Sequence, residues 1–242
     1  MPILERLPEN VKGRDFVVGD LHGSYEELCV ELESHHFDRH ADRLIAVGDL
    51  IDRGQSSFQC LRLTEEPWFF TVWGNHESLM LRGLRERPGS DEFRLWMQNG
   101  GEWALERDLD ELRTLITELA DIVPLAIELP VKGKTIGVVH AEVPGDDWAT
   151  WSQPLTKEQK GVAIWSRTAL LGALAGREPA PVRGIDYVIF GHTPIAAPAR
   201  VGNRIYLDTG GGYSNGRPTL VEIDPDRLGC IDTCPSLFSP TR

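Results

Sequence analysis

The chain has 242 residues, of which 41% are hydrophobic and 26% are charged, a balance typical of a globular protein rather than a disordered or fibrous one. With 37 acidic and 25 basic residues, its formal net charge is −12. Because a chain this acidic repels phosphate groups at long range, we expect no nucleic-acid or membrane partner. Phosphate chemistry would then need a local reversal of this field, most simply by bound metal cations.

The N-terminal segment has neither a basic start nor an apolar stretch, so we expect no signal peptide. No apolar run approaches the roughly 18 residues that cross a bilayer, so a cytoplasmic protein is expected. Cys29 and Cys60 lie in apolar patterns and are expected to be buried thiols. Cys230 and Cys234 leave a zinc site or a disulfide open.

Five short apolar runs each end in a polar residue that is able to bind a metal ion. The runs cover residues 16–18, 44–47, 69–73, 136–139 and 187–190. The polar residues after them, most of them behind a glycine, are Asp20 with His22, Asp49, Asn75, His140 and His192. Continuous β-branched and aromatic runs are typical of strands buried on both faces. The first three runs are spaced like consecutive βαβ units, so their carboxyl ends should meet at one sheet edge.

Helical patterns lie between these runs and after them. Residues 78–120 are expected to form a helical insert within a single α/β domain that covers residues 1–242. Three pairs have the spacing of a helix capping box: Ser24 with Glu27, Asp108 with Glu111, and Thr156 with Gln159. After His192, short strands are expected at residues 204–208 and 219–223.

The six polar residues at the strand ends offer three imidazoles, two carboxylates and one amide. This donor set suits Mn²⁺, Fe or Zn²⁺. Six protein ligands are too many for one catalytic ion with an open position, so two ions that share a ligand are expected. Asp49 is the expected bridge, because a carboxylate has two oxygens. A single histidine after a strand is more often a core residue than a ligand, but four of the seven histidines fall at these strand ends.

Three further residues suit work on a phosphate ester. Arg53, which follows Asp52, has a planar guanidinium that can hold two phosphate oxygens. His76 adjoins Asn75 and titrates near neutral pH, as a general acid for a leaving alkoxide must. Arg167 is a second candidate for holding the phosphate, although its local sequence would equally suit a residue at the rim of the site.

Three ordered motifs resemble those of a known enzyme family. Residues 19–23 (GDLHG), 48–54 (GDLIDRG) and 74–77 (GNHE), together with His140 and residues 191–193 (GHT), resemble the signature of the PPP-family metallophosphoesterases. The similarity is greatest to the short serine/threonine protein phosphatases of bacteria and lambdoid phages, and it extends from about residue 16 to residue 223.

The resemblance implies a four-layer α/β/β/α sandwich with two mixed sheets. It implies one ion held by Asp20, His22 and Asp49, and a second held by Asp49, Asn75, His140 and His192. Mn²⁺ is the metal that this subgroup uses most readily, and a metal-bridging hydroxide attacks the phosphorus in line. Phosphate contacts are then expected from Arg53, Arg167 and Asn75. His76, oriented by Asp52, would protonate the seryl or threonyl oxygen that leaves the phosphorylated protein or peptide.

Two alternatives remain open at this point. Symmetrical dinucleoside tetraphosphatases share the metal core, but they typically have GNHD and lack the Asp-Arg pair, so Glu77, Asp52 and Arg53 favour the protein phosphatase. A non-catalytic phosphoprotein-binding module would show degraded ligands, and none of the six is degraded. One departure from the family is Trp73, which stands where an arginine is usual. The sequence leaves open the physiological substrate, activity on phosphotyrosine, the native metal, the oligomeric state and the role of the C-terminal tail.

Overall fold

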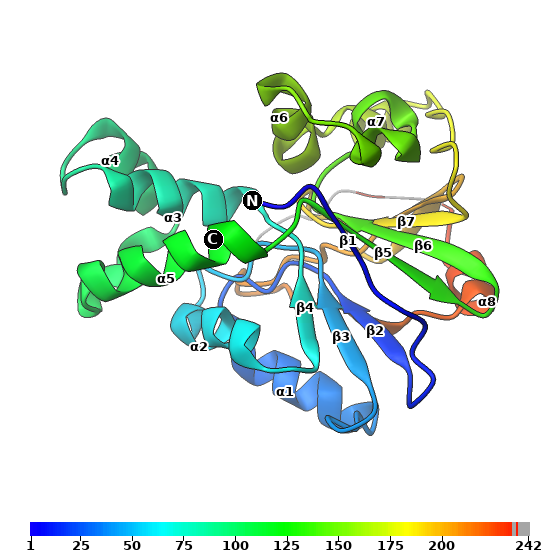
Figure 1. Ribbon diagram of the computed structural model, residues 1–242, viewed down its shortest axis with the longest axis horizontal. Helices are drawn as coiled ribbons and strands as arrows, with labels where there is room; N and C mark the ends of the chain where they lie inside the picture. The colour runs from blue at the N-terminus through cyan, green and yellow to red at the C-terminus, as the bar shows by residue number, and fades with distance from the viewer. Residues whose placement is uncertain (234–235, 237–242) are drawn as a thin grey trace.

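In the computed structural model, which describes residues 1–233 and 236, two mixed β-sheets lie face to face between helices (Figure 1). The four-stranded sheet has the order β10-β2-β3-β4. Its strands are β2 (Asp15–Val18), β3 (Arg43–Ala46), β4 (Phe69–Thr71) and β10 (Leu220–Glu222). The first three of these are parallel, and β10 runs antiparallel to β2.

The six-stranded sheet has the order β1-β5-β6-β7-β9-β8. Its strands are β1 (Leu4–Arg6), β5 (Ala126–Val131), β6 (Lys134–Val139), β7 (Tyr187–Phe190), β8 (Ala199–Val201) and β9 (Arg204–Tyr206). The pairs β5–β6 and β8–β9 are antiparallel, while β6 and β7 are parallel. The predicted strands are confirmed, and both sheets are mixed as expected.

Alternate side chains of each central strand enter two different apolar layers. On β2 and β3, Val17 and Ile45 point between the sheets and pack in one cluster with residues such as Val138 of β6. Phe16 and Leu44 point the other way, into the cluster that includes helix residues. Because both faces are buried, these strands are apolar throughout rather than alternating, which is why the sequence shows them so clearly.

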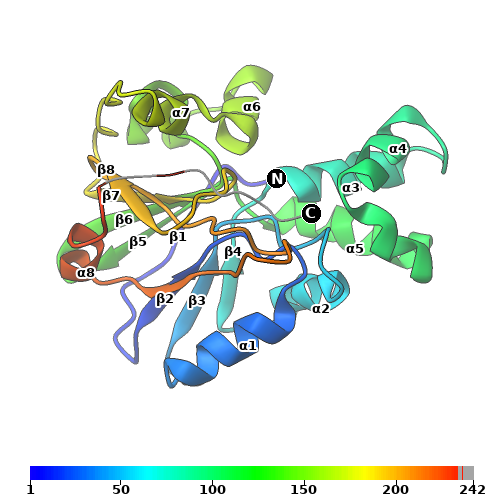
Figure 2. The ribbon, with the colours of Figure 1, turned by 180° about the vertical axis from the view of Figure 1, so that it is seen from behind.

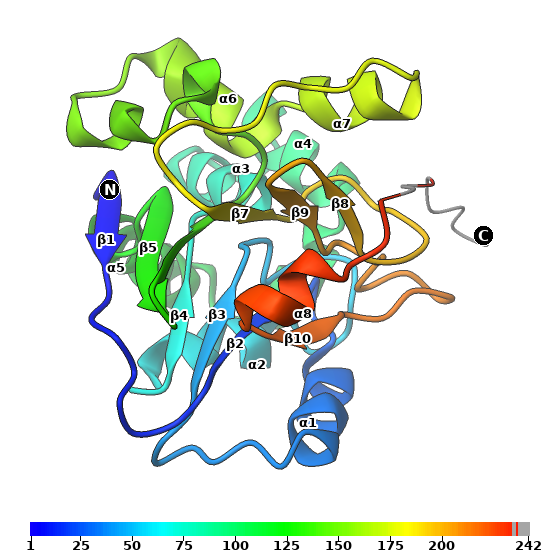
Figure 3. The same ribbon diagram turned by 90° about the vertical axis from the view of Figure 1, so that its right-hand side faces the viewer.

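Helices cover both outer faces of the pair of sheets. The α-helices are α1 (Tyr25–Ser34), α2 (Ser57–Arg62), α3 (Asn75–Arg85), α4 (Asp91–Gln98), α5 (Leu109–Ile122), α6 (Lys157–Trp165), α7 (Thr168–Leu174) and α8 (Pro225–Gly229). The short 3₁₀ helices are η1 (Leu63–Glu65), η2 (Gly101–Glu106), η3 (Pro144–Asp146) and η4 (Trp148–Ser152). Helices α1 and α2 lie on the four-stranded side, and α6 and α7 on the opposite side (Figures 1 and 3). Helices α3, α4 and α5 project together from one end (Figure 2).

One of the three predicted capping boxes is complete, and a second is formed only by its N-cap residue. Thr156 and Gln159 form the full capping box, and Asp108 accepts hydrogen bonds from the first turn of α5. The capping box at Ser24 is wrong: its hydroxyl accepts no bond from α1 and instead accepts one from the backbone N–H of Gly212. The helix predicted from residue 78 begins earlier, at Asn75.

The cysteine predictions are partly corrected. Cys60 is buried as expected, but Cys29 is only half-buried and Cys230 is exposed. The predicted pairing or zinc role of Cys230 and Cys234 is not described, because Cys234 lies outside the described residues. Within residues 1–233 and 236, no helix has the length and apolar character needed to cross a membrane.

Candidate active site

The carboxyl ends of five parallel strands carry the predicted site residues to one place. Strands β2, β3 and β4 end at one edge of their sheet, and β6 and β7 end at the facing edge of the other. All six predicted metal ligands are buried, none being more than 4% exposed: Asp20, His22, Asp49, Asn75, His140 and His192.

Asp49 lies between two groups of imidazoles. Within the described chain, two sets of residues have donor atoms close enough to hold a metal ion: His22, Asp49 and His76, and Asp49, His140 and His192. The two oxygens of Asp49 face different sets, because Oδ2 lies 3.6 Å from His22 Nε2 and Oδ1 lies 3.4 Å from His140 Nε2. This arrangement suits a carboxylate that bridges two ions.

The hydrogen bonds of the three imidazoles leave one ring nitrogen of each turned toward the site. Nδ1 of His22 donates to the carbonyl of Ile51 (2.9 Å), and Nδ1 of His140 donates to the carbonyl of Val47 (2.8 Å). Nε2 of His192 contacts the carbonyl of Trp165 (3.1 Å). Since a carbonyl only accepts, the proton lies on these nitrogens and the other nitrogen keeps its lone pair for a metal.

The charges of the buried groups also fit metal binding. Burial lowers the pKa of His22 and His140, and it lowers the pKa of His192 to about 3, so all three rings are neutral. Burial by itself would raise the pKa of Asp49, but the nearby imidazoles and the N–H of His76 hold it well below its usual range. Neutral imidazoles and an ionised carboxylate are the forms that coordinate metals.

The other two predicted ligands, Asp20 and Asn75, lie outside these two sets but next to their members. Both oxygens of Asp20 accept from the backbone N–H of His192 (3.0 and 3.1 Å), and Asn75 Oδ1 lies 2.9 Å from His140 Nε2. Burial and the neighbouring carboxylates of Asp208 and Asp49 raise the pKa of Asp20 well above normal. Excess buried negative charge of this kind is what a bound cation offsets.

Several site residues have a backbone conformation that only glycine adopts easily. His22, Asp49, Asp52, Arg53 and His192 all have positive φ, between 43° and 75°. Each such residue costs about 1–3 kcal/mol, and such costs concentrate at functional sites. These residues lie in three loops, after β2, β3 and β7, and their backbone conformations direct the side chains of these loops toward one site.

The glycine before His192 serves a close approach rather than a turn. A Cβ on Gly191 would lie 1.9 Å from Asp20 Oδ1, so only glycine leaves room for that carboxylate. This contact explains why glycine precedes the polar residue at this strand end.

His76 and Asp52 form a buried pair beside the Asp49 cluster. Nδ1 of His76 donates to Asp52 Oδ2 at 2.7 Å, as predicted. Asp52 Oδ1 also accepts from two indoles, Trp96 Nε1 at 3.0 Å and Trp103 Nε1 at 2.8 Å. Burial lowers the pKa of His76, but the carboxylates of Asp49 and Asp52 outweigh it and raise the pKa above its usual value. The ring is therefore suited to carry a proton.

The two predicted arginines lie on opposite sides of this cluster. Arg53 is half-buried, with Nη1 2.5 Å from His22 Nε2 and Nη2 3.0 Å from His76 Nε2. An ion on His22 Nε2 would displace the guanidinium from this contact. Arg167 is exposed, and its Nη2 donates to the carbonyl of His192 at 3.3 Å. Both cations therefore lie beside the place where a phosphate would meet the ions.

Sequence reasoning missed four side chains of the site. Glu77 accepts from the backbone N–H groups of Asp49, Leu50 and Gly74, which fixes the Asp49 loop against α3. Burial and the charge of Asp49 raise the pKa of Glu77 to about 7. Its place in the GNHE motif was the available signal.

For the other three missed residues, Asp208, Trp96 and Trp103, the sequence pattern indicates a role in the site less clearly. Asp208 is buried beside the ligands, and burial raises its pKa to about 6. Trp96 and Trp103 both donate to Asp52, a role that the apolar pattern of the insert does not indicate. Trp73, which replaces the usual arginine, is fully buried and donates to Ser78 Oγ at 2.7 Å.

Comparison with known proteins identifies the family. The model of the calcineurin-like phosphoesterase family matches residues 16–196, and the chain belongs to this family of metallophosphoesterases. The chain is 36% identical to serine/threonine-protein phosphatase 2 of Salmonella typhimurium over 211 residues, covering 86% of this chain and 92% of the relative. It is 33% identical to serine/threonine-protein phosphatase 1 of the same organism, covering 86% and 91%.

A symmetrical bis(5'-nucleosyl)-tetraphosphatase of Actinobacillus pleuropneumoniae is similar over a shorter segment. It is 39% identical over 71 residues, which cover 28% of this chain and 26% of that enzyme. Among solved structures, that of a proposed diadenosine tetraphosphatase superposes with a TM-score of 0.63 and 23% identity, covering 99% of this chain and all of that one. At that identity the likeness shows the fold alone.

Proposed function

We propose that this chain is a protein serine/threonine phosphatase that hydrolyses phosphomonoesters with two divalent metal ions, most readily Mn²⁺. The observation that carries the proposal is the buried His76–Asp52 pair beside the shared Asp49 carboxylate. A seryl or threonyl alkoxide is a poor leaving group, and it needs a positioned acid of this kind.

The ligand set supports a dinuclear centre. Asp20, His22 and Asp49 would hold one ion, and a second would be held by Asp49, Asn75, His140 and His192. Two such ions would supply an activated water for in-line attack and would offset the negative charge of the phosphate. His76 lies in the same group as His22 and Asp49, and its Nε2 is 3.9 Å from Asp49 Oδ2, so this nitrogen would face a phosphate bound at the ions.

The chain's own residues perform the remaining steps. Arg53 and Arg167 would hold phosphate oxygens through charge-assisted hydrogen bonds, with Asn75 beside them. Asp52 accepts from Nδ1 of His76, so the proton that His76 delivers to the leaving oxygen comes from Nε2. The hydrogen bonds from the two indoles favour the ionised form of Asp52 and orient it for this task.

The symmetrical tetraphosphatase alternative has less support. Its relative matches only a quarter or so of either chain, whereas the protein phosphatases match most of both. A phosphoprotein-binding module without activity would not need the buried His76–Asp52 pair.

A substrate panel tests the proposal. Purified protein with Mn²⁺ is given phosphoserine, phosphothreonine and phosphotyrosine peptides and, in parallel, diadenosine tetraphosphate. We expect the highest kcat/KM on the phosphoserine or phosphothreonine peptide. A higher kcat/KM on diadenosine tetraphosphate would overturn the assignment.

A further inference from the structure

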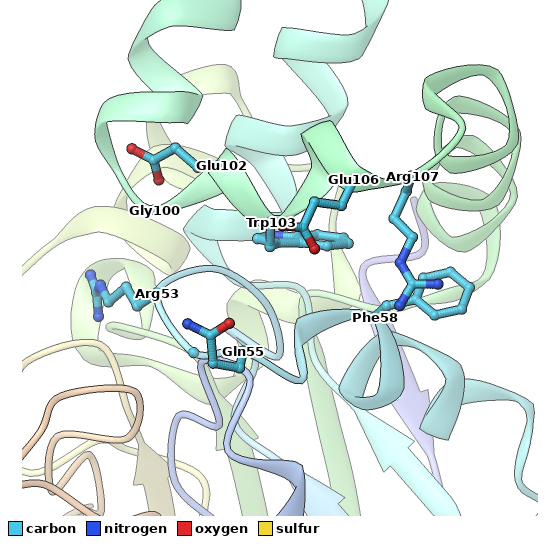
Figure 4. Close-up of a pocket in the computed structure, with 9 residues that line it drawn as sticks. Arg53, Gln55, Phe58, Gly100, Glu102, Trp103, Glu106 and Arg107 are labelled. Atoms are coloured by element: carbon cyan, nitrogen blue, oxygen red, sulfur yellow. The ribbon is translucent and has the colours of Figure 1, made fainter.

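A polar cavity of about 280 Å³ lies beside Arg53, outside the group of metal ligands (Figure 4). It separates the loop that carries Arg53 from the 3₁₀ helix η2 of the helical insert. The Arg53 side chain lies at one end, and Arg107 lies on Phe58 at the other, with Gln55 and Glu106 between them (Figure 4). The cavity therefore begins at the side chain that is expected to hold the phosphate.

The two walls of the cavity are fixed to each other. The backbone N–H of Arg53 donates to the carbonyl of Gly100 at 3.0 Å. Gly100 has a φ of 103°, and a Cβ there would lie 2.6 Å from the Arg53 nitrogen, so only glycine allows this contact. Trp103 joins the walls a second time through its bond to Asp52. Because these hydrogen bonds hold the two walls together, the cavity needs little rearrangement when a side chain enters it.

The charged groups of the two arginines that line the cavity already contact other side chains of the protein, whereas those of its two glutamates do not. The Arg107 guanidinium lies 4.5 Å above the ring of Phe58, and Arg53 is turned toward the imidazoles. Glu102 and Glu106 are exposed, and across the described part of the chain neither side chain makes a hydrogen bond or an ion pair. Their oxygens are available to accept from a cationic donor.

We propose that this cavity is a subsite for a basic side chain, lysine or arginine, that flanks the phosphorylated residue of a peptide substrate. The inference rests on the proposed function, because it is the phosphate at Arg53 that would bring the neighbouring residue here. Adjacent residues of an extended peptide are about 3.3–3.6 Å apart, so a residue that flanks the phosphorylated one would lie close to Arg53, where the cavity begins.

The same features disfavour the nucleoside part of a dinucleotide as the occupant. The cavity is at the small end of the roughly 300–1,000 Å³ range of sites for drug-sized ligands. Arg107 covers one face of Phe58, on which a base would have to stack. The further phosphates of a polyphosphate chain would meet two unpaired carboxylates.

Matched peptides and three variants test the inference. Phosphothreonine peptides carry arginine, alanine or glutamate at each position flanking the phosphorylated residue. Each is hydrolysed by the Mn²⁺-loaded wild type, by the double variant Glu102→Gln with Glu106→Gln, and by Glu106→Lys. Glu118→Gln is the control, because Glu118 is an exposed acid on α5 that does not line the cavity.

The expected readout is the ratio of kcat/KM for the best arginine peptide to kcat/KM for its alanine counterpart. We expect this ratio to fall about 3- to 30-fold in the double variant, because two partly exposed charge pairs are lost. In Glu106→Lys the preference should shift toward the glutamate peptide, and added salt should weaken it in the wild type. Glu118→Gln should keep the wild-type ratio.

Two outcomes overturn the inference in different ways. If the wild type hydrolyses the phosphopeptides but the ratio is near one, or is the same in the double variant, the subsite is wrong and the proposed function stands. If no phosphopeptide is hydrolysed while diadenosine tetraphosphate is, the proposed function and the subsite both fall.

Discussion

The position of Asp49 is the residue-scale feature that decides how many ions the site holds. Its two oxygens face two different groups of imidazoles, at 3.6 and 3.4 Å from the nearest nitrogens. Asp49→Asn keeps the shape of the side chain but removes an anionic oxygen, so we expect both ions to bind more weakly. Elemental analysis after gel filtration should find fewer than two ions per chain.

Asp52→Asn is the matched control for this measurement. Asp52 is buried close by but touches His76 rather than a metal position, so this variant should retain two ions. Two ions at wild-type affinity in Asp49→Asn would contradict the bridging role.

His76 should matter most when the leaving group needs a proton. A nitrophenolate is stable near neutral pH, whereas a seryl alkoxide is not. We expect His76→Asn to slow hydrolysis of a phosphoserine peptide about 10²- to 10⁴-fold, and hydrolysis of p-nitrophenyl phosphate far less. Steady-state kinetics on both substrates, with metal content measured in parallel, gives the comparison. Equal losses on both substrates with the ions retained would contradict the acid role.

At the scale of secondary-structure elements, the helical insert contributes directly to the site. Trp96 of α4 and Trp103 of η2 donate to the same carboxylate, Asp52, that orients His76. Trp103→Phe removes one donor and keeps an aromatic ring. Loss of a group that orients a site residue typically costs about 10–100-fold, so we expect a loss near 10-fold in kcat on the phosphoserine peptide.

Trp151→Phe is the control for the Trp103 variant. It makes the same substitution at a buried indole whose N–H has no hydrogen-bond partner in the described part of the chain. Its kcat should match that of the wild type. If the two variants had the same kcat, the insert would have no part in positioning His76.

A second prediction at the scale of secondary-structure elements concerns the ion pair between Arg14, just before β2, and Asp42. Asp42 is 4% exposed and accepts from Arg14 Nη2 at 2.6 Å and from the Arg14 backbone at 2.7 Å. Burial raises the pKa of Asp42, but these bonds and that from Asp38 outweigh it, so the pKa lies below its usual value. The stability that this carboxylate contributes is therefore present above pH 4 and is lost as the pH falls through its folded-state pKa.

Denaturant unfolding of Asp42→Asn at several pH values measures this contribution. We expect the variant to lose about 1–3 kcal/mol of unfolding free energy at pH 7, and the gap from the wild type to narrow below about pH 4. Asp121→Asn, at an exposed position of α5, should show neither effect. A gap that stayed constant down to pH 2 would show that the charge of Asp42 is not its source.

The sequence indicates the parts of this site that follow from local patterns. It does not indicate the parts that depend on contacts between residues far apart in the chain. Buried parallel strands are apolar throughout and end in glycine and a ligand, so local pattern alone predicts their carboxyl ends. The partner of Ser24 is Gly212, far away along the chain, and a capping pattern cannot report such competition. The bonds from Trp96 and Trp103 to Asp52 likewise leave no trace in helical periodicity, since a packing indole and a donating indole have the same spacing.

At the scale of the whole molecule, we infer a single domain, because both sheets contribute side chains to one inner apolar layer. Its net charge of −12 and its buried acids make cation binding a source of stability. Ions that bind only the folded chain stabilise it by about 2.7 kcal/mol at one hundred times Kd. For a chain of this size we expect Mn²⁺ to raise the Tm by about 5–10 °C.

Differential scanning calorimetry with Mn²⁺ and with a chelator makes this measurement. The shift should be smaller in Asp49→Asn, where both ions are held less tightly. An identical Tm with Mn²⁺ and with the chelator would argue against ions that bind only the folded state.

The predicted ligands follow strands of both sheets, so the site lies at the junction between the two sheets. Asp49 and Asn75 follow strands of the four-stranded sheet and His140 follows a strand of the other, and His140 Nε2 lies 3.4 Å from Asp49 Oδ1 and 2.9 Å from Asn75 Oδ1. The two halves are aligned by the apolar packing of residues such as Val17 and Val138, together with the hydrogen bond from His140 to the carbonyl of Val47. A misplacement of about 1 Å can reduce a rate 10²-fold. We therefore expect a conservative substitution in this distant packing to reduce the rate as a substitution within the site would. The apolar layer between the two sheets thus helps to set the relative positions of the predicted ligands.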